Sequence, residues 1–284
     1  NKCFITRSTI ECIDELIREF EGISSEGYLT LGKVKGQYVK ESITKENIEE
    51  NLEYYLKILE WIKTYCTELP CNEALKFNAS DKAQLDDVLG ACFIDSIFIA
   101  KENNYLLLAE EQSLRSIAFN DHKVLGFSTY VLLIYSIKLG YIDKVIFDNL
   151  IAKMISMNYR FLPVNSDILL KCVDMANFRY ELPFDLALKT LHNNISSEDS
   201  CIPVVTDFFY SLYNSINIHQ IRLNLIIPTI DALLKDRNIN SVFQKLIPLI
   251  EVKFRLLPIQ KDELINIIIN YGRTMIEKSI FLRR

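Results

Sequence analysis

One stretch, Phe93 to Arg115, constrains the fold most, because it sets a helix directly against a strand. An apolar helical segment that carries Asp95 runs to an Asn-Asn turn, and the short apolar run that follows ends at Glu110 and Glu111. A helix of about nine residues is roughly 14 Å long and a strand of about five residues covers roughly 16 Å, so the chain returns nearly to its starting level. The spacing therefore predicts that Asp95 and the Glu110–Glu111 pair lie at one edge of a sheet.

Two interpretations of these carboxylates remain open. Side chains at the carboxyl edge of a parallel sheet occupy the usual ligand position of open α/β folds, and hard oxygen ligands of this kind suit Mg²⁺ or Mn²⁺. The structural alternative is a carboxylate near the start of a helix, which the helix dipole favours, followed by a strand end that is solvated. Spacing alone does not decide between a metal site and a solvated edge.

Composition and charge limit the class of protein. The chain has 284 residues, enough for one large domain or two ordinary ones, and its 49% hydrophobic and 24% charged residues are typical of a soluble globular protein. With only 8 Gly and 7 Pro, an all-β fold is disfavoured. The net charge of −5 and the absence of a long Lys/Arg run give no general electrostatic footprint for nucleic acid.

The cysteines and the chain ends indicate the cellular setting. Seven cysteines without a CxxC motif, together with three histidines, argue against a zinc site and against a disulfide framework. A reducing cytoplasm is the simplest setting for such thiols, and most of them are expected to act as small apolar groups. No apolar run approaches the roughly 18 residues that a membrane helix needs. Because the chain begins with Asn and its first residues already look structured, we expect a segment of a longer cytoplasmic protein.

The first part of the chain predicts strands that alternate with helices. We expect a strand over Lys2–Thr6, followed by a helix whose first turn is closed by a capping box of Ser8 and Glu11. The segment Gly22–Glu41 is expected to be exposed, with a hairpin around Lys35 and Gly36. A long amphipathic helix should begin at Thr44, with Trp61 packed beneath it.

Further along, short strands are expected at Val124–Phe127 and Tyr159–Val164, with a helix at Thr129–Leu139 that ends at Gly140. From Pro183 onward only helices are expected. The pattern predicts an α/β fold, with a parallel sheet flanked by helices in residues 1–180 and an all-α domain in residues 181–284.

Three segments resemble one known family. FITRSTIECIDELI contains Glu15 before a hydrophobic residue, FIDSIFIAKENNYLLLAEEQSLR contains Asp95 and then Glu111 three residues before a Leu-Arg pair, and VLGFSTYVLLIYSIKLGYI is followed by NYRFLPVNSDILL. In their order and spacing, over roughly residues 1–180, these segments resemble the PIN-domain family, metal-dependent nucleases that mostly cut RNA.

The resemblance implies a fold, a cofactor and a set of site residues. A PIN-like domain would be a small parallel sheet between helices, whose edge carboxylates hold one or two Mg²⁺ or Mn²⁺ ions that activate water for in-line attack on a phosphodiester. In this chain Glu15, Asp95 and Glu111 would be the catalytic metal ligands, Glu110 an auxiliary ligand, and Arg115 or Thr129 would lie near the phosphate. The expected function is a divalent-metal-dependent endoribonuclease module of a larger cytoplasmic protein.

Two departures from the family pattern support an alternative. The family's first Asp has no match, since the opening strand reads CFITRS, and Glu111 stands where Asp is usual, which lengthens the reach to a metal. The alternative is a catalytically incomplete PIN-like scaffold that serves protein–protein or RNA interaction. An all-helical scaffold leaves the Tyr159–Val164 run unexplained. The sequence predicts no particular oligomeric state.

Overall fold

A computed structural model of the chain describes residues 2–23, 27–34, 37–159 and 162–281. It divides into two compact units, Asn1–Leu132 and Leu133–Arg284. The elements of the first unit, in chain order, are β1 (Cys3–Thr6), α1 (Arg7–Gly22), β2 (Tyr28–Val34), β3 (Gln37–Ile43), α2 (Lys45–Tyr65), β4 (Cys66–Leu69), the 3-10 helix η1 (Glu73–Lys76), α3 (Ala79–Leu89), α4 (Ala91–Asn103), β5 (Leu107–Leu108), α5 (Gln112–His122) and β6 (Gly126–Phe127).

The opening strand passes directly into a helix because Thr6 ends one element and caps the next. Thr6 has extended backbone angles, and its hydroxyl accepts a hydrogen bond from the Thr9 N–H at 3.0 Å. The capping box expected at Ser8 and Glu11 was therefore wrong, because the cap lies two residues earlier. Glu11 instead forms an exposed ion pair with Arg7 at 2.9 Å.

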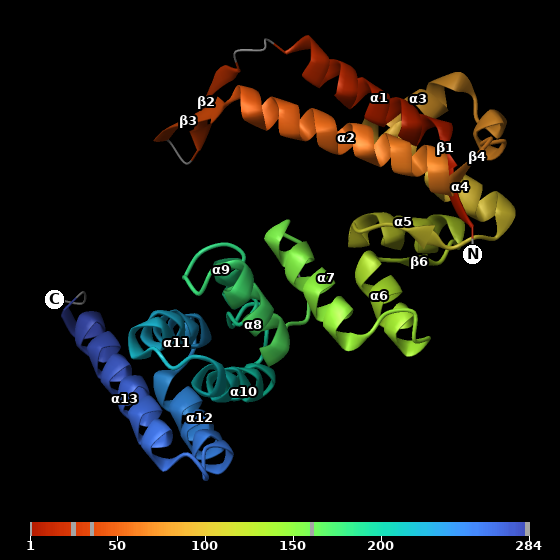
Figure 1. Ribbon diagram of the computed structural model, residues 1–284. Coiled ribbons are helices and arrows are strands. Elements are labelled where there is room, and N and C mark those ends of the chain that lie inside the picture. The colour runs from red at the N-terminus through yellow and green to blue at the C-terminus, as the bar shows by residue number, and fades with distance from the viewer. Residues whose placement is uncertain (1, 24–26, 35–36, 160–161, 282–284) are drawn as a thin grey trace. The chain divides into compact units, whose positions relative to one another are not determined.

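The long helix α2 begins where the sequence predicts, and it packs along α1 (Figure 1). Thr44 and Asn47 form a capping box across its first turn. Leu59 and Ile62 face inward, and Trp61 on the other side of the helix is 52% exposed. The expectation that Trp61 packs under the helix was wrong, because the inward stripe is already filled by aliphatic side chains.

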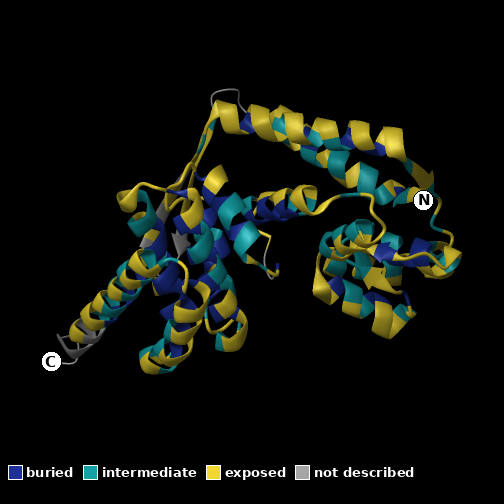
Figure 2. Cartoon of the chain, turned by 60° about the horizontal axis from the view of Figure 1, so that its bottom comes forward, coloured by how far each residue is buried: buried dark blue, intermediate teal, exposed yellow. Residues whose placement is uncertain are grey.

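Between these helices, β2 and β3 form the expected antiparallel hairpin, and the predicted turn at Lys35 and Gly36 lies outside the described residues. The two helices bury few side chains: Ile17 in α1, and Ile48, Leu59 and Ile62 in α2. Figure 2 shows the pair largely exposed or partly exposed along its length.

Two parallel strand pairs occur in the first unit. β1 pairs with β4 from Cys3 opposite Cys66 to Thr6 opposite Leu69, and β5 pairs with β6. Asn104, in the left-handed conformation, ends α4 and turns the chain into β5. A core shared by α4, β5, α5 and the adjoining residues Ala109 and Val124 holds this region together: Ile97, Ala100, Leu107, Ala109, Leu114, Ala118 and Val124.

The predicted α/β start is confirmed in outline, but the sheet is smaller than expected. Each parallel sheet within the described residues has only two strands. At the expected edge strand Tyr159–Val164, residues 160–161 are outside the description and the others form no strand. The physical reason is local, since the Tyr159 N–H bonds back to the Met154 carbonyl and so closes the end of the preceding helix.

The described part of the second unit is helical, as predicted for the C-terminal part of the chain. Helix α6 (Thr129–Lys138) crosses the division and ends before Gly140, which has a φ of +73°. The remaining helices are α7 (Lys144–Ser156), α8 (Ser166–Met175), α9 (Phe184–Lys189), α10 (Glu198–Ser215), α11 (His219–Leu234), α12 (Ile239–Lys253) and α13 (Pro258–Phe281). Fully buried aromatic side chains, among them Phe184, Phe208 and Phe254, fill their core.

Helices α7 and α8 pack on each other, and α8 packs on α10, so residues 144–175 lie in the second compact unit. The domain boundary expected near residue 180 stays a prediction about the PIN-like domain. Within the described residues, none of the helices combines the length and apolar character needed to cross a bilayer.

The core of the first unit predicts a large effect for one substitution. Ile97 is fully buried on α4, so Ile97→Ala is expected to lower the free energy of unfolding by about 3 kcal/mol through lost burial and a residual cavity. Val88→Ala on α3, where the side chain is 74% exposed, is the control and should stay within about 0.5 kcal/mol. Urea denaturation of the variants measures both, and equal stabilities for the two would contradict this core.

Candidate functional site

A pocket of about 500 Å³ lies at the carboxyl ends of β1 and β4. β1 leads from Thr6 into α1, and β4 stops at Leu69 because Pro70 lacks the N–H that a further ladder bond needs. Helix α4 brings Asp95 to the same place. The lining residues are Thr6, Arg7, Ser8, Glu68, Leu69, Pro70, Cys71 and Asp95. The carboxyl edge of parallel strands is the usual ligand position in α/β folds, and Asp95 is the predicted site residue that reaches it.

The carboxylate of Asp95 is already paired with a cation. Its Oδ1 lies 3.0 Å from the Nζ of Lys82, which also binds Asp86, and the side chains of Lys82 and Asp95 are only 17% and 16% exposed. Burial by itself lowers the pKa of Lys82, but the hydrogen bonds to Asp86 and Asp95 outweigh it, and the net pKa is raised. The ammonium therefore stays charged at neutral pH. Beyond this ion pair, the buried Oδ1 makes no regular hydrogen bond.

A thiol completes this side of the pocket. The Sγ of Cys71 donates a weak hydrogen bond to the Asp95 backbone carbonyl at 3.9 Å. Burial raises the pKa of the Cys71 thiol to about 11, so it is protonated at neutral pH and is a poor nucleophile.

Three other predicted site residues meet at the end of the second strand pair. The Glu110 carboxylate accepts a hydrogen bond from the Thr129 N–H at 2.9 Å, and Arg115 Nη1 donates to the carbonyls of Ala109 and Glu110 at 2.6 and 2.7 Å. A Cβ at Gly126 would lie only 2.9 Å from Arg115 Cγ, so the glycine leaves room for the guanidinium stem. These contacts tie the ends of β5 and β6 together, which is a structural use of the groups expected to bind phosphate.

The remaining predicted ligands are not among the residues that line the pocket. Glu15 is exposed on α1, and Glu111 is exposed at the start of α5, where its side chain makes no capping bond. Among the residues that the structure describes, no three His, Cys, Asp or Glu side chains are grouped so that they could hold a metal ion. The structure thus does not bring Glu15, Asp95, Glu110 and Glu111 into one ligand set, and their role as ligands stays a prediction.

The residues at the pocket do not fit a bound divalent ion in this arrangement. Mg²⁺ takes near-octahedral oxygen ligands and is usually held by one or two carboxylates together with water and phosphate. Asp95 is paired with Lys82, which is shared with Asp86, and Glu68 is the other carboxylate among the lining residues. The end of β1 carries Thr6 and Arg7 in place of an acidic residue. A cation bound at Asp95 would have to displace an ammonium group that the protein itself supplies.

Sequence reasoning missed β4 and the Glu68 side chain that it carries, and it did not single out Lys82 on α3. The CTEL run follows α2 without a loop, and four residues are too few to show the alternation that marks a strand. Pro70 was the available signal, because a proline commonly marks the end of such a run.

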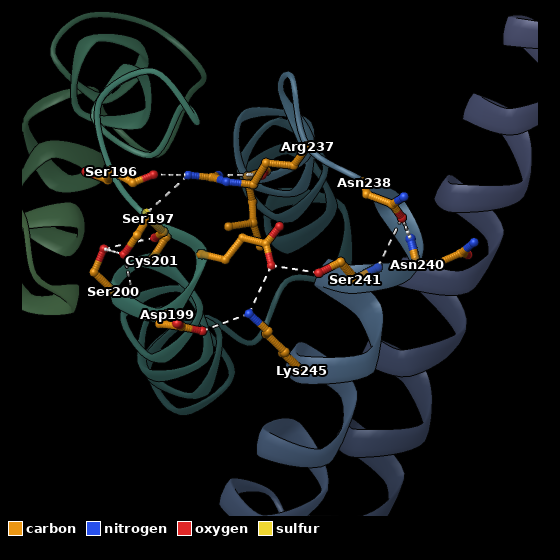
Figure 3. Close-up of polar contacts among 12 residues, drawn as sticks. Ser196, Ser197, Asp199, Ser200, Cys201, Arg237, Asn238, Asn240, Ser241 and Lys245 are labelled. Atoms are coloured by element: carbon orange, nitrogen blue, oxygen red, sulfur yellow. Dashed lines mark hydrogen bonds and ion pairs between the residues drawn. The ribbon is translucent and has the colours of Figure 1, made fainter.

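A second feature that sequence reasoning missed lies in the second unit. Arg237 follows Asp236, which has a positive φ of 57°, and the chain reverses there so that the guanidinium points back between α9 and α10. Figure 3 shows Arg237 directed toward Ser196 and Cys201. Nη1 donates to the carbonyls of Leu191 and Leu233 at 2.5 and 2.6 Å, and Nη2 donates to the Ser196 carbonyl and to the Cys201 sulfur.

The same network continues to α12, and a hollow lies beside it. Glu198 accepts hydrogen bonds from Ser241 at 2.9 Å and from Lys245 at 3.2 Å, which joins the starts of α10 and α12. A hollow of about 310 Å³ next to Cys201 has mainly apolar walls that include Leu162 and Leu191. The polar groups here are used between helices, so this cluster stabilises the unit.

Comparison with known proteins bears on the first unit. Residues 1–120 match a family model described as a PIN domain associated with the TPR-GreAB-C-PIN system. The match confirms the predicted resemblance to PIN domains over this part of the chain. Searches of curated proteins and of solved structures gave no significant match.

The Lys82–Asp95 pair predicts a stability effect with an internal rescue. Lys82→Met leaves a largely buried carboxylate without its counter-ion and should lower the free energy of unfolding by about 2–3 kcal/mol. The double variant Lys82→Met/Asp95→Asn removes the stranded charge and should recover at least half of the loss. Lys63→Met, at an exposed position on α2, is the matched control for loss of a lysine. Urea titrations measure all four proteins, and a double variant less stable than Lys82→Met would contradict the pairing.

The Arg237 network predicts a comparable loss in the second unit. Arg237→Ala leaves three backbone carbonyls without their donor and should lower the free energy of unfolding by about 3 kcal/mol. Arg255→Ala, at an exposed position after α12, should change it by less than about 0.5 kcal/mol. Thermal or urea unfolding compares the two, and similar values would show that the guanidinium contacts do not contribute.

Proposed function

We propose that the PIN-like part of this chain is a catalytically incomplete scaffold that works by protein–protein interaction within a longer protein. The single observation that carries this proposal is the ion pair between Lys82 and Asp95 at the carboxyl edge of β1 and β4. An internal ammonium supplies there the positive charge that a catalytic metal would bring. Unlike a metal ion, an ammonium cannot lower the pKa of a bound water molecule to make a nucleophile.

The strand ends support the same proposal. β1 ends at Thr6 and continues into Arg7 and Ser8, so this strand end brings hydroxyl and guanidinium groups to the pocket and no carboxylate. Since Glu15 and Glu111 are exposed away from the pocket, the carboxylates that would complete a two-metal arrangement are not supplied by the described residues.

A surface on α2 favours protein over RNA as the partner. Tyr54, Ile58, Trp61 and Tyr65 recur at helical spacing and form one outer stripe, on which the three aromatic side chains are 49%, 52% and 65% exposed. Exposed aromatic residues on one helix face are typical of helix-mediated protein contacts. A net charge of −5 disfavours a nucleic-acid backbone.

The description of the matched family supports a larger assembly. It names PIN domains associated with a TPR-GreAB-C-PIN system, which fits a parent protein with several domains. We place that protein in the cytoplasm, where seven unpaired thiols are most readily maintained.

A second candidate function is the divalent-metal-dependent endoribonuclease. The observation that favours it is the position of Asp95, which shares the pocket at the strand ends with Glu68. Under this alternative, Mg²⁺ or Mn²⁺ would take the place of the Lys82 ammonium, and RNA would be the substrate.

Metal titration separates the two candidates. For the incomplete scaffold, the Tm should be the same in EDTA and in millimolar Mn²⁺ or Mg²⁺, and single-stranded RNA should remain intact. A specific ion present at 100 times its Kd would add about 2.7 kcal/mol to the folded state, which is readily seen as a rise in Tm. RNA should also leave the emission of Trp61, the single tryptophan, unchanged.

The matched variants decide the outcome. A rise in Tm with Mn²⁺ that disappears in Asp95→Asn and persists in Asp87→Asn, an exposed carboxylate on α3, would overturn the scaffold proposal. RNA cleavage with the same dependence on Asp95 would establish the nuclease in its place.

A further inference from the structure

Four of the seven cysteines lie in two pairs in the first unit. Cys3 on β1 stands directly opposite Cys66 on β4 in the parallel register, and the Cys3 thiol lies close enough to raise the pKa of Cys66. Neighbouring strands lie about 4.8 Å apart. This separation falls within the roughly 4.4–6.8 Å between Cα atoms that a disulfide requires.

The second pair joins two helices. Cys12 on α1 lies close enough to raise the pKa of Cys92 on α4, and α1 packs against α4. Each pair thus links segments that are distant in sequence, which a sequence without a CxxC motif does not reveal.

Both pairs combine an accessible thiol with a sheltered one. Cys3 and Cys12 are exposed, whereas Cys66 and Cys92 are half-buried. Burial raises the pKa of the Cys66 thiol to about 11, and the neighbouring Cys3 thiol adds to the effect. Burial likewise raises the pKa of Cys92. The exposed member of each pair is therefore the one that meets a reagent in solvent, and its neighbour is placed to react second.

We propose that these pairs are two oxidation sites, at which a peroxide closes the disulfides Cys3–Cys66 and Cys12–Cys92. The exposed thiolate attacks one peroxide oxygen to give a sulfenic acid and releases hydroxide, or an alkoxide from an organic peroxide. The sulfur of the half-buried partner then attacks the sulfenic sulfur, the S–S bond forms, and water leaves with the thiol proton. Two thiols are oxidised and one peroxide is reduced in each closure.

The location of the pairs connects oxidation to the pocket. β1 and β4 carry Thr6 and Glu68 to the pocket, and α4 carries Asp95. One disulfide joins the two strands, and the other joins α4 to the helix that follows β1. When both disulfides are closed, they connect the elements that form the pocket wall and restrict the unfolded chain. The oxidised protein should therefore unfold at a higher temperature.

The other cysteines are internal controls. Cys71 is half-buried, and Cys172 and Cys201 are buried. Burial raises the pKa of Cys172 to about 12. These three thiols are expected to remain reduced under the conditions that oxidise the pairs.

The test is a thiol count on the full chain. Reduced protein, freed of reductant, is treated with increasing hydrogen peroxide, quenched, alkylated under denaturing conditions and examined by intact mass and non-reducing peptide mapping. The expected result is loss of four of the seven alkylation sites, linked peptides containing Cys3 with Cys66 and Cys12 with Cys92, and a rise in Tm that a reductant reverses.

Serine variants make each pair separately testable. Cys3→Ser should retain the Cys12–Cys92 link and lose the other, Cys12→Ser should do the reverse, and Cys71→Ser should behave as the unsubstituted chain. Oxidation that stops at sulfinic acid, disulfides between different chains, linkage to Cys71, Cys172 or Cys201, or no loss of alkylation sites would each overturn the proposal.

Discussion

The parallel pairing of β1 with β4 is the constraint on which the first unit depends. Parallel neighbours cannot be joined by a tight turn, so the chain must leave β1, cross over and return in the same direction before the strands can pair. Here the crossover consists of α1, the β2–β3 hairpin and α2. The pairing places Thr6 beside Leu69, opens the pocket at the strand ends and sets Cys3 opposite Cys66.

The charges at the carboxyl ends of β1 and β4 determine whether Asp95 is free to bind a metal ion. A carboxylate held largely away from solvent needs a compensating charge, because desolvation disfavours its ionised form. In this chain Lys82 on α3 supplies that charge to Asp95 on α4, and it bridges to Asp86 one turn further along its own helix. A protein cation and a metal ion compete for the same electrostatic role, and the presence of the protein cation is the basis for the proposal that this unit has a binding function.

The second unit is held together differently. Its helices bury large aromatic and aliphatic side chains, and several of its polar contacts lie at helix ends, where backbone carbonyls lack partners. Arg237 donates hydrogen bonds to such carbonyls beyond α9 and at the end of α11. Glu198 joins the starts of α10 and α12. Apolar burial supplies most of the cohesion, and these charged side chains select which helix ends meet.

The sequence by itself determined the elements whose apolar residues recur at a regular spacing and whose ends are marked by capping or turn residues. The helices of the C-terminal half, the start of α2 at Thr44 and the helix–turn–strand segment around Asp95 follow from local preferences. The two short motifs within residues 1–120 carry the resemblance to PIN domains that the family model confirms. Only the tertiary structure decided the partner of β1, the ion pair of Lys82 with Asp95, and the separation of Glu15 and Glu111 from the pocket. The physical reason is that helix formation is governed by neighbours three and four residues apart, whereas strand pairing, charge compensation and thiol contacts join residues whose proximity the local sequence does not encode.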